Sequence, residues 1–120
     1  MIKVYGIPNC NTVKKGLDWL KENQVEYEFH DFKKKGITKE KLEEWVKSSG
    51  WEKLVNKKGT TWRTLPVEEQ QQITNKRSAI KLMIEKPSII KRPVIELDGK
   101  LFVGFDESQY SENFKKTSAG

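Results

Sequence analysis

Two short stretches near the start of the chain alternate apolar and polar residues, and a helical pattern lies between them. Residues 2–5 are β-prone and end where Gly6 and Pro8 indicate a loop. Over residues 12–23 apolar side chains recur every three to four positions, which predicts a helix. Alternation over residues 25–30 then predicts a second strand, parallel to the first. The chain therefore opens with a β-α-β unit.

The middle of the chain carries only helical patterns. Helices are predicted from Thr38 to Gly50, over 51–55, over 67–73 and over 78–85, where Pro87 closes the last one. The lysine-rich stretches 33–35 and 57–61 are interpreted as loops.

The last third returns to strands. Residues 94–97 and 101–103 flank Asp98-Gly99, a strong signal for a hairpin with a tight primed turn. Asp106 is placed to cap a final helix that carries Tyr110 and Phe114 four residues apart. The order β-α-β, helices, β-β-α predicts an α/β fold.

Composition narrows the class of protein. A chain of 120 residues fits one domain, and its net charge of +6 comes with 33% charged residues. Most of the basic residues are lysines that alternate with glutamates, as on a solvated helix face, and no nucleic-acid-binding motif accompanies them. We therefore expect no nucleic-acid partner. Arginine occurs only at Arg63, Arg77 and Arg92, where its fork geometry could matter.

The single cysteine, Cys10, cannot form an internal disulfide, so a reducing cytoplasm is the expected compartment. No stretch approaches the roughly 20 apolar residues that cross a bilayer, and the N-terminus lacks the pattern of a signal peptide. Neither secretion nor a membrane partner is expected.

Cys10 lies in a loop just before a helix, where backbone N–H groups and the helix dipole favour a thiolate. It is therefore a candidate nucleophile, and the alternative is a small buried apolar residue. Arg92 and Pro93 precede the third strand at a junction expected to face this loop. A cis Pro93 there would fix the approach of a substrate, and Arg92 could bind an oxyanion or carboxylate. The alternatives are an ordinary strand-start proline and a surface charge.

These motifs resemble the arsenate reductase (ArsC) family, most closely its YffB-like branch, with Spx as another relative. The resemblance rests on residues 5–12, 59–63, 87–94 and 103–105, in consistent order along nearly the whole chain. It implies a thioredoxin-like fold in one ArsC-like domain, residues 1–120. In that domain a helical insertion, residues 36–86, separates the thioredoxin-like parts 1–35 and 87–116.

The resemblance assigns roles residue by residue. It implies that Cys10 is the catalytic nucleophile and that Arg92, before a cis Pro93, binds an anionic substrate. Arg63 falls in the region of a second anion-binding arginine. The third family arginine is missing, since Val103-Gly104-Phe105 stands in its place. Loss of one charge-assisted hydrogen bond weakens arsenate binding by roughly ten- to a hundred-fold.

Residues next to the cysteine complete the predicted site. Asn11 and Thr12 are expected to contact the substrate, and Lys14 and Lys15 could attract the carboxylates of glutathione or form a solvated face. Val13 stands where a Cys-x-x-Cys switch would carry its second cysteine, so any resolving thiol must come from another molecule.

One histidine and one cysteine supply too few ligands for a metal site, and the isolated His30 is expected to have a surface role. We therefore expect a cytoplasmic, glutathione-dependent thiol reductase without a metal or tightly bound cofactor, whose partner is glutathione or a glutaredoxin-like protein. Arsenate reduction itself is expected to be weak or absent. The alternative is a non-enzymatic, Spx-like protein-binding module that docks on RNA polymerase.

Overall fold

The computed structural model describes residues 2–119, and side chains as far as residue 114. The chain divides into two compact units. The first combines the chain up to Asp31 with the chain from Arg92 onward, and the second comprises Phe32–Lys91. The predicted insertion, residues 36–86, lies inside the second unit.

The first unit contains a four-stranded mixed sheet. Its strands are β1 (Ile2–Gly6), β2 (Tyr27–Asp31), β3 (Val94–Leu97) and β4 (Lys100–Val103), in the order β2-β1-β3-β4. β1 is parallel to β2 and antiparallel to β3, and β4 is antiparallel to β3. Asp98 and Gly99 join the last two strands with φ values of 49° and 79°, the geometry of the primed turn that the sequence predicts.

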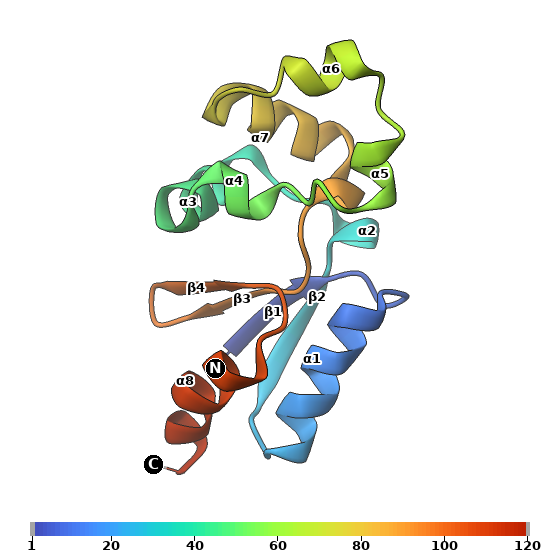
Figure 1. Cartoon of the computed structure of the whole chain (residues 1–120). Coiled ribbons are helices and arrows are strands. Elements are labelled where there is room, and N and C mark those ends of the chain that lie inside the picture. The colour runs from blue at the N-terminus through green and yellow to red at the C-terminus, as the bar shows by residue number, and fades with distance from the viewer. Residues whose placement is uncertain (1, 120) are drawn as a thin grey trace. The chain divides into compact units, whose positions relative to one another are not determined.

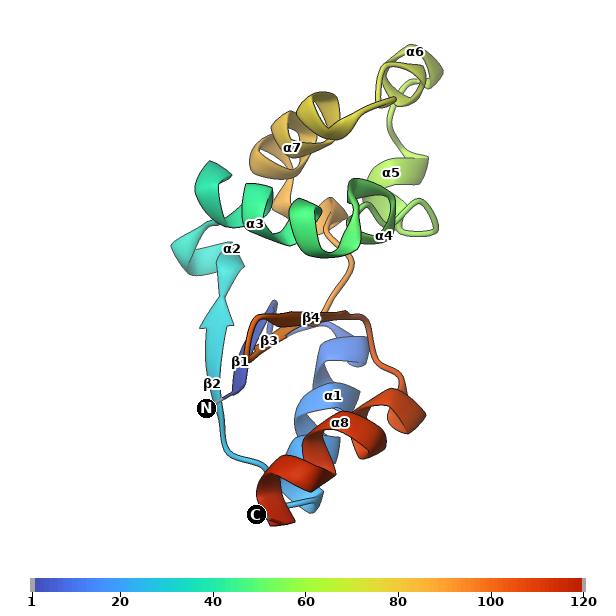
Figure 2. The same cartoon turned by 90° about the vertical axis from the view of Figure 1, so that its left-hand side faces the viewer.

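Two helices, α1 (Asn11–Glu22) and α8 (Glu107–Ala119), pack on the same face of this sheet (Figures 1 and 2). The buried core between the two layers is made by Ile2, Val4, Trp19, Leu20, Val25, Ile95, Phe102, Tyr110 and Phe114. Asp106 caps α8, since its Oδ1 accepts from the backbone N–H of Gln109 at 3.1 Å, which confirms the predicted cap.

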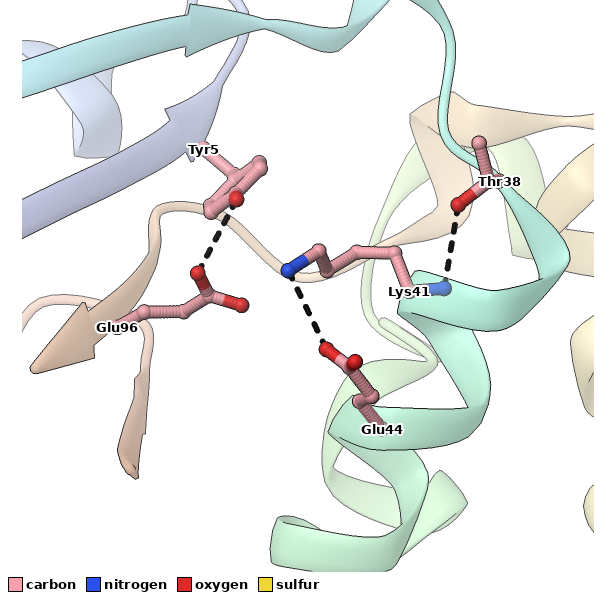
Figure 3. Close-up of polar contacts among 5 residues, drawn as sticks. All are labelled: Tyr5, Thr38, Lys41, Glu44 and Glu96. Atoms are coloured by element: carbon pink, nitrogen blue, oxygen red, sulfur yellow. Dashed lines mark hydrogen bonds and ion pairs between the residues drawn. The ribbon is translucent and has the colours of Figure 1, made fainter. Parts of the chain in front are cut away.

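Tyr5 shows how the other face of the sheet is organised. Its Oη donates to Glu96 Oε1 on the neighbouring strand β3 at 3.1 Å (Figure 3). The ring centroid of Tyr5 lies 4.9 Å from that of His30 on β2. Strand alternation thus places Tyr5 on the sheet face opposite to its apolar neighbour Val4.

The second unit is helical. Its elements are α2 (Phe32–Lys35), α3 (Lys39–Ser49), α4 (Trp51–Leu54), α5 (Thr60–Arg63), α6 (Val67–Gln71), α7 (Lys76–Glu85) and the 3-10 helix η1 (Pro87–Ile89). Thr38 caps α3 by accepting the backbone N–H of Lys41 (Figure 3), and Asn75 caps α7 through a reciprocal pair with Ser78. Leu42 and Trp45 of α3 and Met83 of α7 are fully or almost fully buried.

The order of strands and long helices confirms the predicted α/β fold with helices between the second and third strands. The loop predicted at 33–35 is wrong, because residues 32–35 form α2, and the loop predicted at 57–61 is partly wrong, because α5 begins at Thr60. A four-residue helix spans little more than one turn and leaves no apolar period to detect. Burial of Phe32 holds the first of these turns in place. No helix within residues 2–119 has the length and apolarity to cross a bilayer.

Gly6 allows β1 and α1 to approach each other closely. A Cβ atom at Gly6 would lie 2.9 Å from Cγ2 of Val13, whose side chain is fully buried. Contacts this short force the neighbouring atoms to move. The strand end and the first turn of the helix are therefore fitted to each other around the loop that carries Cys10.

We expect Gly6→Ala to lower the free energy of unfolding by about 1–3 kcal/mol because the core is already close-packed there. Urea denaturation measures this loss. Adding Val13→Ala removes the obstructing methyl groups, so the double variant should lose less than the sum of the two single losses. Strict additivity would contradict the assigned contact.

Candidate functional site

Cys10 is the N-cap residue of α1. Its backbone is extended, with φ −97° and ψ 125°, and its carbonyl accepts the first helical hydrogen bond from Lys14 N–H at 3.0 Å. The Cys10 N–H in turn donates to the carbonyl of Ile7 at 3.3 Å, which closes the preceding turn. The side chain is partly exposed. The thiol therefore stands at the positive end of the helix dipole with access to solvent.

The surroundings of the Cys10 sulfur favour its negative form. Burial alone raises the pKa of the Cys10 thiol. The backbone N–H of Val13, the side chain of Arg92, the backbone N–H of Thr12 and the positive charge of Arg92 all act in the opposite direction, and the net pKa lies below its ordinary value. The backbone N–H groups that favour the thiolate belong to the first turn of α1, where helix N–H groups have no intrahelical partner.

Arg92 brings the second part of the site to the cysteine. It immediately precedes β3, the strand that pairs with β1, and the Arg92–Pro93 peptide bond is cis. Arg92 is partly exposed, whereas Pro93 is buried. A guanidinium can bind a thiolate and still offer N–H groups to an anion, because it carries five donors. The structure thus brings together Cys10, Arg92 and Pro93, as the sequence led us to expect.

Pro93 lies in a tightly packed region together with residues of three other segments. The carbonyl of Pro93 accepts from Gly104 N–H at 2.8 Å, and the carbonyl of Gly104 accepts from Tyr110 Oη at 2.9 Å. On the other side, a Cβ at Gly16 of α1 would lie 3.2 Å from Pro93 Cγ. Neither the contact of Gly16 nor that of the Tyr110 hydroxyl was predicted from the sequence. A glycine inside a helical pattern was the available signal for a close approach.

The polar residues that follow Cys10 lie on the first turns of α1. Asn11, Thr12, Lys14 and Lys15 are all exposed. Of these residues, Thr12 interacts with the Cys10 thiol through its backbone N–H, and Lys14 donates its backbone N–H to the Cys10 carbonyl. Roles for these side chains in binding a substrate or glutathione stay predictions.

Arg63 lies in the other compact unit, at the end of α5, with an exposed side chain. Gly59 precedes this helix and accepts the Arg63 N–H at 3.1 Å through its carbonyl. A role for Arg63 in anion binding stays a prediction. His30 is partly buried beside the ring of Tyr5.

The place of the missing third arginine is occupied by a backbone turn. Gly104 is buried and has φ +84°, a conformation that an arginine would adopt only with strain. Both of its backbone polar groups are engaged, by Pro93 and by Tyr110. The Gly104 backbone therefore joins the Pro93 segment to Tyr110.

The arrangement provides a nucleophilic sulfur, a neighbouring guanidinium and the N-terminal amides of a helix. Such a set can attack an electrophilic sulfur or the electrophilic central atom of an oxyanion and stabilise the negative charge that develops. Within residues 2–119 no group of three His, Cys, Asp or Glu side chains is placed to hold a metal ion.

Known proteins with the same architecture match the chain over most of its length. An uncharacterised protein of Haemophilus influenzae is 43% identical over 114 residues, which cover 95% of this chain and 99% of that protein. The solved structure of a protein named YffB has a TM-score of 0.90 at 41% identity and covers 95% of this chain and 99% of its own. An arsenate reductase (ArsC) related protein from Brucella melitensis has a TM-score of 0.77 at 45% identity, covering 93% and 92%.

More distant relatives include regulators. The global transcriptional regulator Spx of Streptococcus agalactiae is 25% identical over 111 residues, covering 91% of this chain and 80% of that protein. These similarities confirm the predicted YffB-like resemblance and the relation to Spx.

The sequence profile of the ArsC family matches residues 5–113, a range that contains the Cys10 turn, the Arg92–Pro93 bond and the Gly104 turn. Because this match spans far more than half of the chain and agrees with the fold of the solved relatives, the chain belongs to the ArsC family.

Proposed function

We propose that the chain is a cytoplasmic thiol reductase that uses glutathione as its co-substrate and Cys10 as its nucleophile. The observation that carries this proposal is the setting of Cys10, whose thiolate is favoured by the Val13 N–H and by Arg92. A lowered pKa in a partly exposed thiol is typical of reactive cysteines rather than of buried structural ones.

The chemistry of a single cysteine requires two external thiols per turnover. With a disulfide substrate, the Cys10 thiolate attacks one sulfur, forms a mixed disulfide and releases the other sulfur as a thiolate. A glutathione thiolate then attacks the substrate-derived sulfur of the mixed disulfide and releases the Cys10 thiolate, so that a disulfide forms between glutathione and the substrate. A second glutathione thiolate attacks the glutathione sulfur of that disulfide and releases the reduced substrate. Two glutathiones are thereby oxidised to one glutathione disulfide. A protein of the glutaredoxin type could replace glutathione as the donor of electrons.

The proposal gives the neighbouring residues distinct roles. Arg92 stabilises the attacking thiolate and binds an anionic or carboxylate-bearing substrate. Arg63 is proposed as a second anion ligand on the helical insertion. Exposed Lys14 and Lys15 lie within the first turns after the cysteine, where their charges would attract the carboxylates of glutathione.

A second candidate function is a protein-binding module that docks on RNA polymerase, as a Spx-like regulator would. Similarity to Spx over 91% of the chain supports it. A thiolate-stabilising environment has no purpose in a module whose redox chemistry has lapsed, so the setting of Cys10 favours the reductase.

Oxidised glutathione provides a direct test of the proposed nucleophile. We expect mass spectrometry to detect a glutathione adduct on Cys10 that forms faster in the native chain than in a urea-denatured control, because only the native site favours the thiolate. Cys10→Ser should form no adduct and should lose reductase activity while keeping its circular dichroism spectrum. Reductase activity retained by Cys10→Ser would exclude Cys10 as the nucleophile.

Arg92→Gln tests the source of the thiolate stabilisation. Removal of the positive charge and its N–H donors should raise the pKa of Cys10, because both favour the thiolate. Iodoacetamide reacts with the thiolate, so the alkylation rate rises with pH through this pKa, and the rise should move to higher pH in the variant. Arg92→Lys keeps the charge and should shift less. Identical pH profiles for all three proteins would contradict the role of Arg92.

Arsenate is expected to be a poor substrate, because buried Gly104 occupies the region where the family carries its third arginine. Glutathione-dependent arsenate reduction by the purified protein should be weak or absent, with Cys10→Ser as the blank. Rapid turnover that depends on Cys10 would show that two arginines suffice.

A further inference from the structure

Two hydrogen bonds in series join helix α8 to the segment that carries Arg92. Tyr110 Oη donates to the carbonyl of Gly104 at 2.9 Å, and Gly104 N–H donates to the carbonyl of Pro93 at 2.8 Å. Pro93 follows Arg92, whose side chain interacts with Cys10. The position of one buried hydroxyl is thereby coupled, through the Gly104 peptide groups, to the backbone beside the reactive thiol.

Helix α1 contacts the side chains of Pro93 and Tyr110 at Gly16. A Cβ at Gly16 would lie 3.2 Å from Pro93 Cγ and 3.4 Å from Tyr110 Oη, so the helix backbone passes directly against both. Cys10 is the N-cap of this helix. The spacing between the Cys10 thiol and the segment of Arg92 is therefore set where α1, Pro93 and Tyr110 meet.

Packing explains the ring of Tyr110 but not its hydroxyl. The ring lies in an aromatic cluster, with centroid distances of 5.5 Å to Trp19, 5.1 Å to Phe105 and 4.9 Å to Phe114. A phenylalanine would make the same contacts. Burial, assisted by the Asp106 carboxylate, raises the pKa of Tyr110 above its usual range. The hydroxyl therefore remains protonated at neutral pH and keeps its role as a donor.

We propose that Tyr110 is a positioning residue for the thiol chemistry, because its hydroxyl holds Gly104 and, through it, keeps the Pro93 segment and Arg92 beside Cys10. This inference rests on the proposed function in so far as Cys10 acts as a thiolate. It predicts an effect on the cysteine from a residue that does not touch the sulfur. A purely structural tyrosine would affect the stability of the fold alone.

Tyr110→Phe removes the hydroxyl and keeps the ring. We expect the midpoint of the pH profile for Cys10 alkylation by iodoacetamide to rise by about 0.5 unit or more, which slows alkylation about threefold at pH values below the midpoint. The profile is measured well below the melting temperature of each variant. Val25→Ala is the matched control, because this core residue precedes β2 at the strand end remote from Cys10. It should lower the melting temperature and leave the midpoint unchanged.

A double variant tests the path of the effect. If Tyr110 acts through Arg92, adding Tyr110→Phe to Arg92→Gln should not move the midpoint further. Gly16→Ala supplies an independent perturbation, since it removes no hydrogen-bonding group but places a methyl group against Pro93 and Tyr110. It should raise the midpoint in the same direction.

The outcomes separate this inference from the proposed function. An alkylation midpoint in the unsubstituted chain at the value of a free thiol, about 8.5, would refute the proposed function. A lowered midpoint that neither Tyr110→Phe nor Gly16→Ala changes would refute only the role of Tyr110. Equal shifts from Tyr110→Phe in the presence and absence of Arg92 would likewise overturn the proposed path.

Discussion

The proposed chemistry of this protein depends on the interaction of the Cys10 thiolate with the N–H groups of α1 and with Arg92. Burial opposes the negative charge of the thiolate, whereas helix N–H groups and Arg92 favour it, and the second group of effects prevails. A cysteine in an unfolded chain has neither the helix N–H groups nor the neighbouring arginine. The strand order that places β3 beside β1 is what brings Arg92 to the N-terminus of α1.

Three glycines of the first unit allow the close packing around the contact between Cys10 and Arg92. Gly6 lets α1 approach the end of β1 more closely than a Cβ atom would permit, and Gly16 allows a tight contact between α1 and Pro93. Gly104 turns the chain after β4 and uses both backbone groups to join Pro93 to Tyr110. The same turn lies where the family resemblance implies a third arginine, so the support that we propose for the thiol and the weak arsenate reduction that we expect would have one structural origin.

Local signals in the sequence were sufficient for much of this architecture. Asp98-Gly99 predicted the hairpin because few other residue pairs adopt two successive positive φ values. Cys10 could be placed at a helix start from its loop neighbours, and Thr38 and Asp106 acted as the expected caps. Cys10 and Arg92 are more than 80 positions apart, and the predicted order of strands and helices, together with the family resemblance, suggested that they meet.

Other features depend on tertiary packing and had no local pattern. The short helices α2 and α5 are too brief to show an apolar period, and Phe32 anchors the first of them through burial that only the folded unit reveals. Tyr110 was visible as an apolar position on α8, but the partner of its hydroxyl is a backbone carbonyl, which carries no sequence signal. The most direct measurement of the central claim is a pH titration of Cys10 alkylation in the native, unsubstituted chain. The account predicts a midpoint below the value of about 8.5 for a free thiol, and a midpoint at or above that value would contradict it.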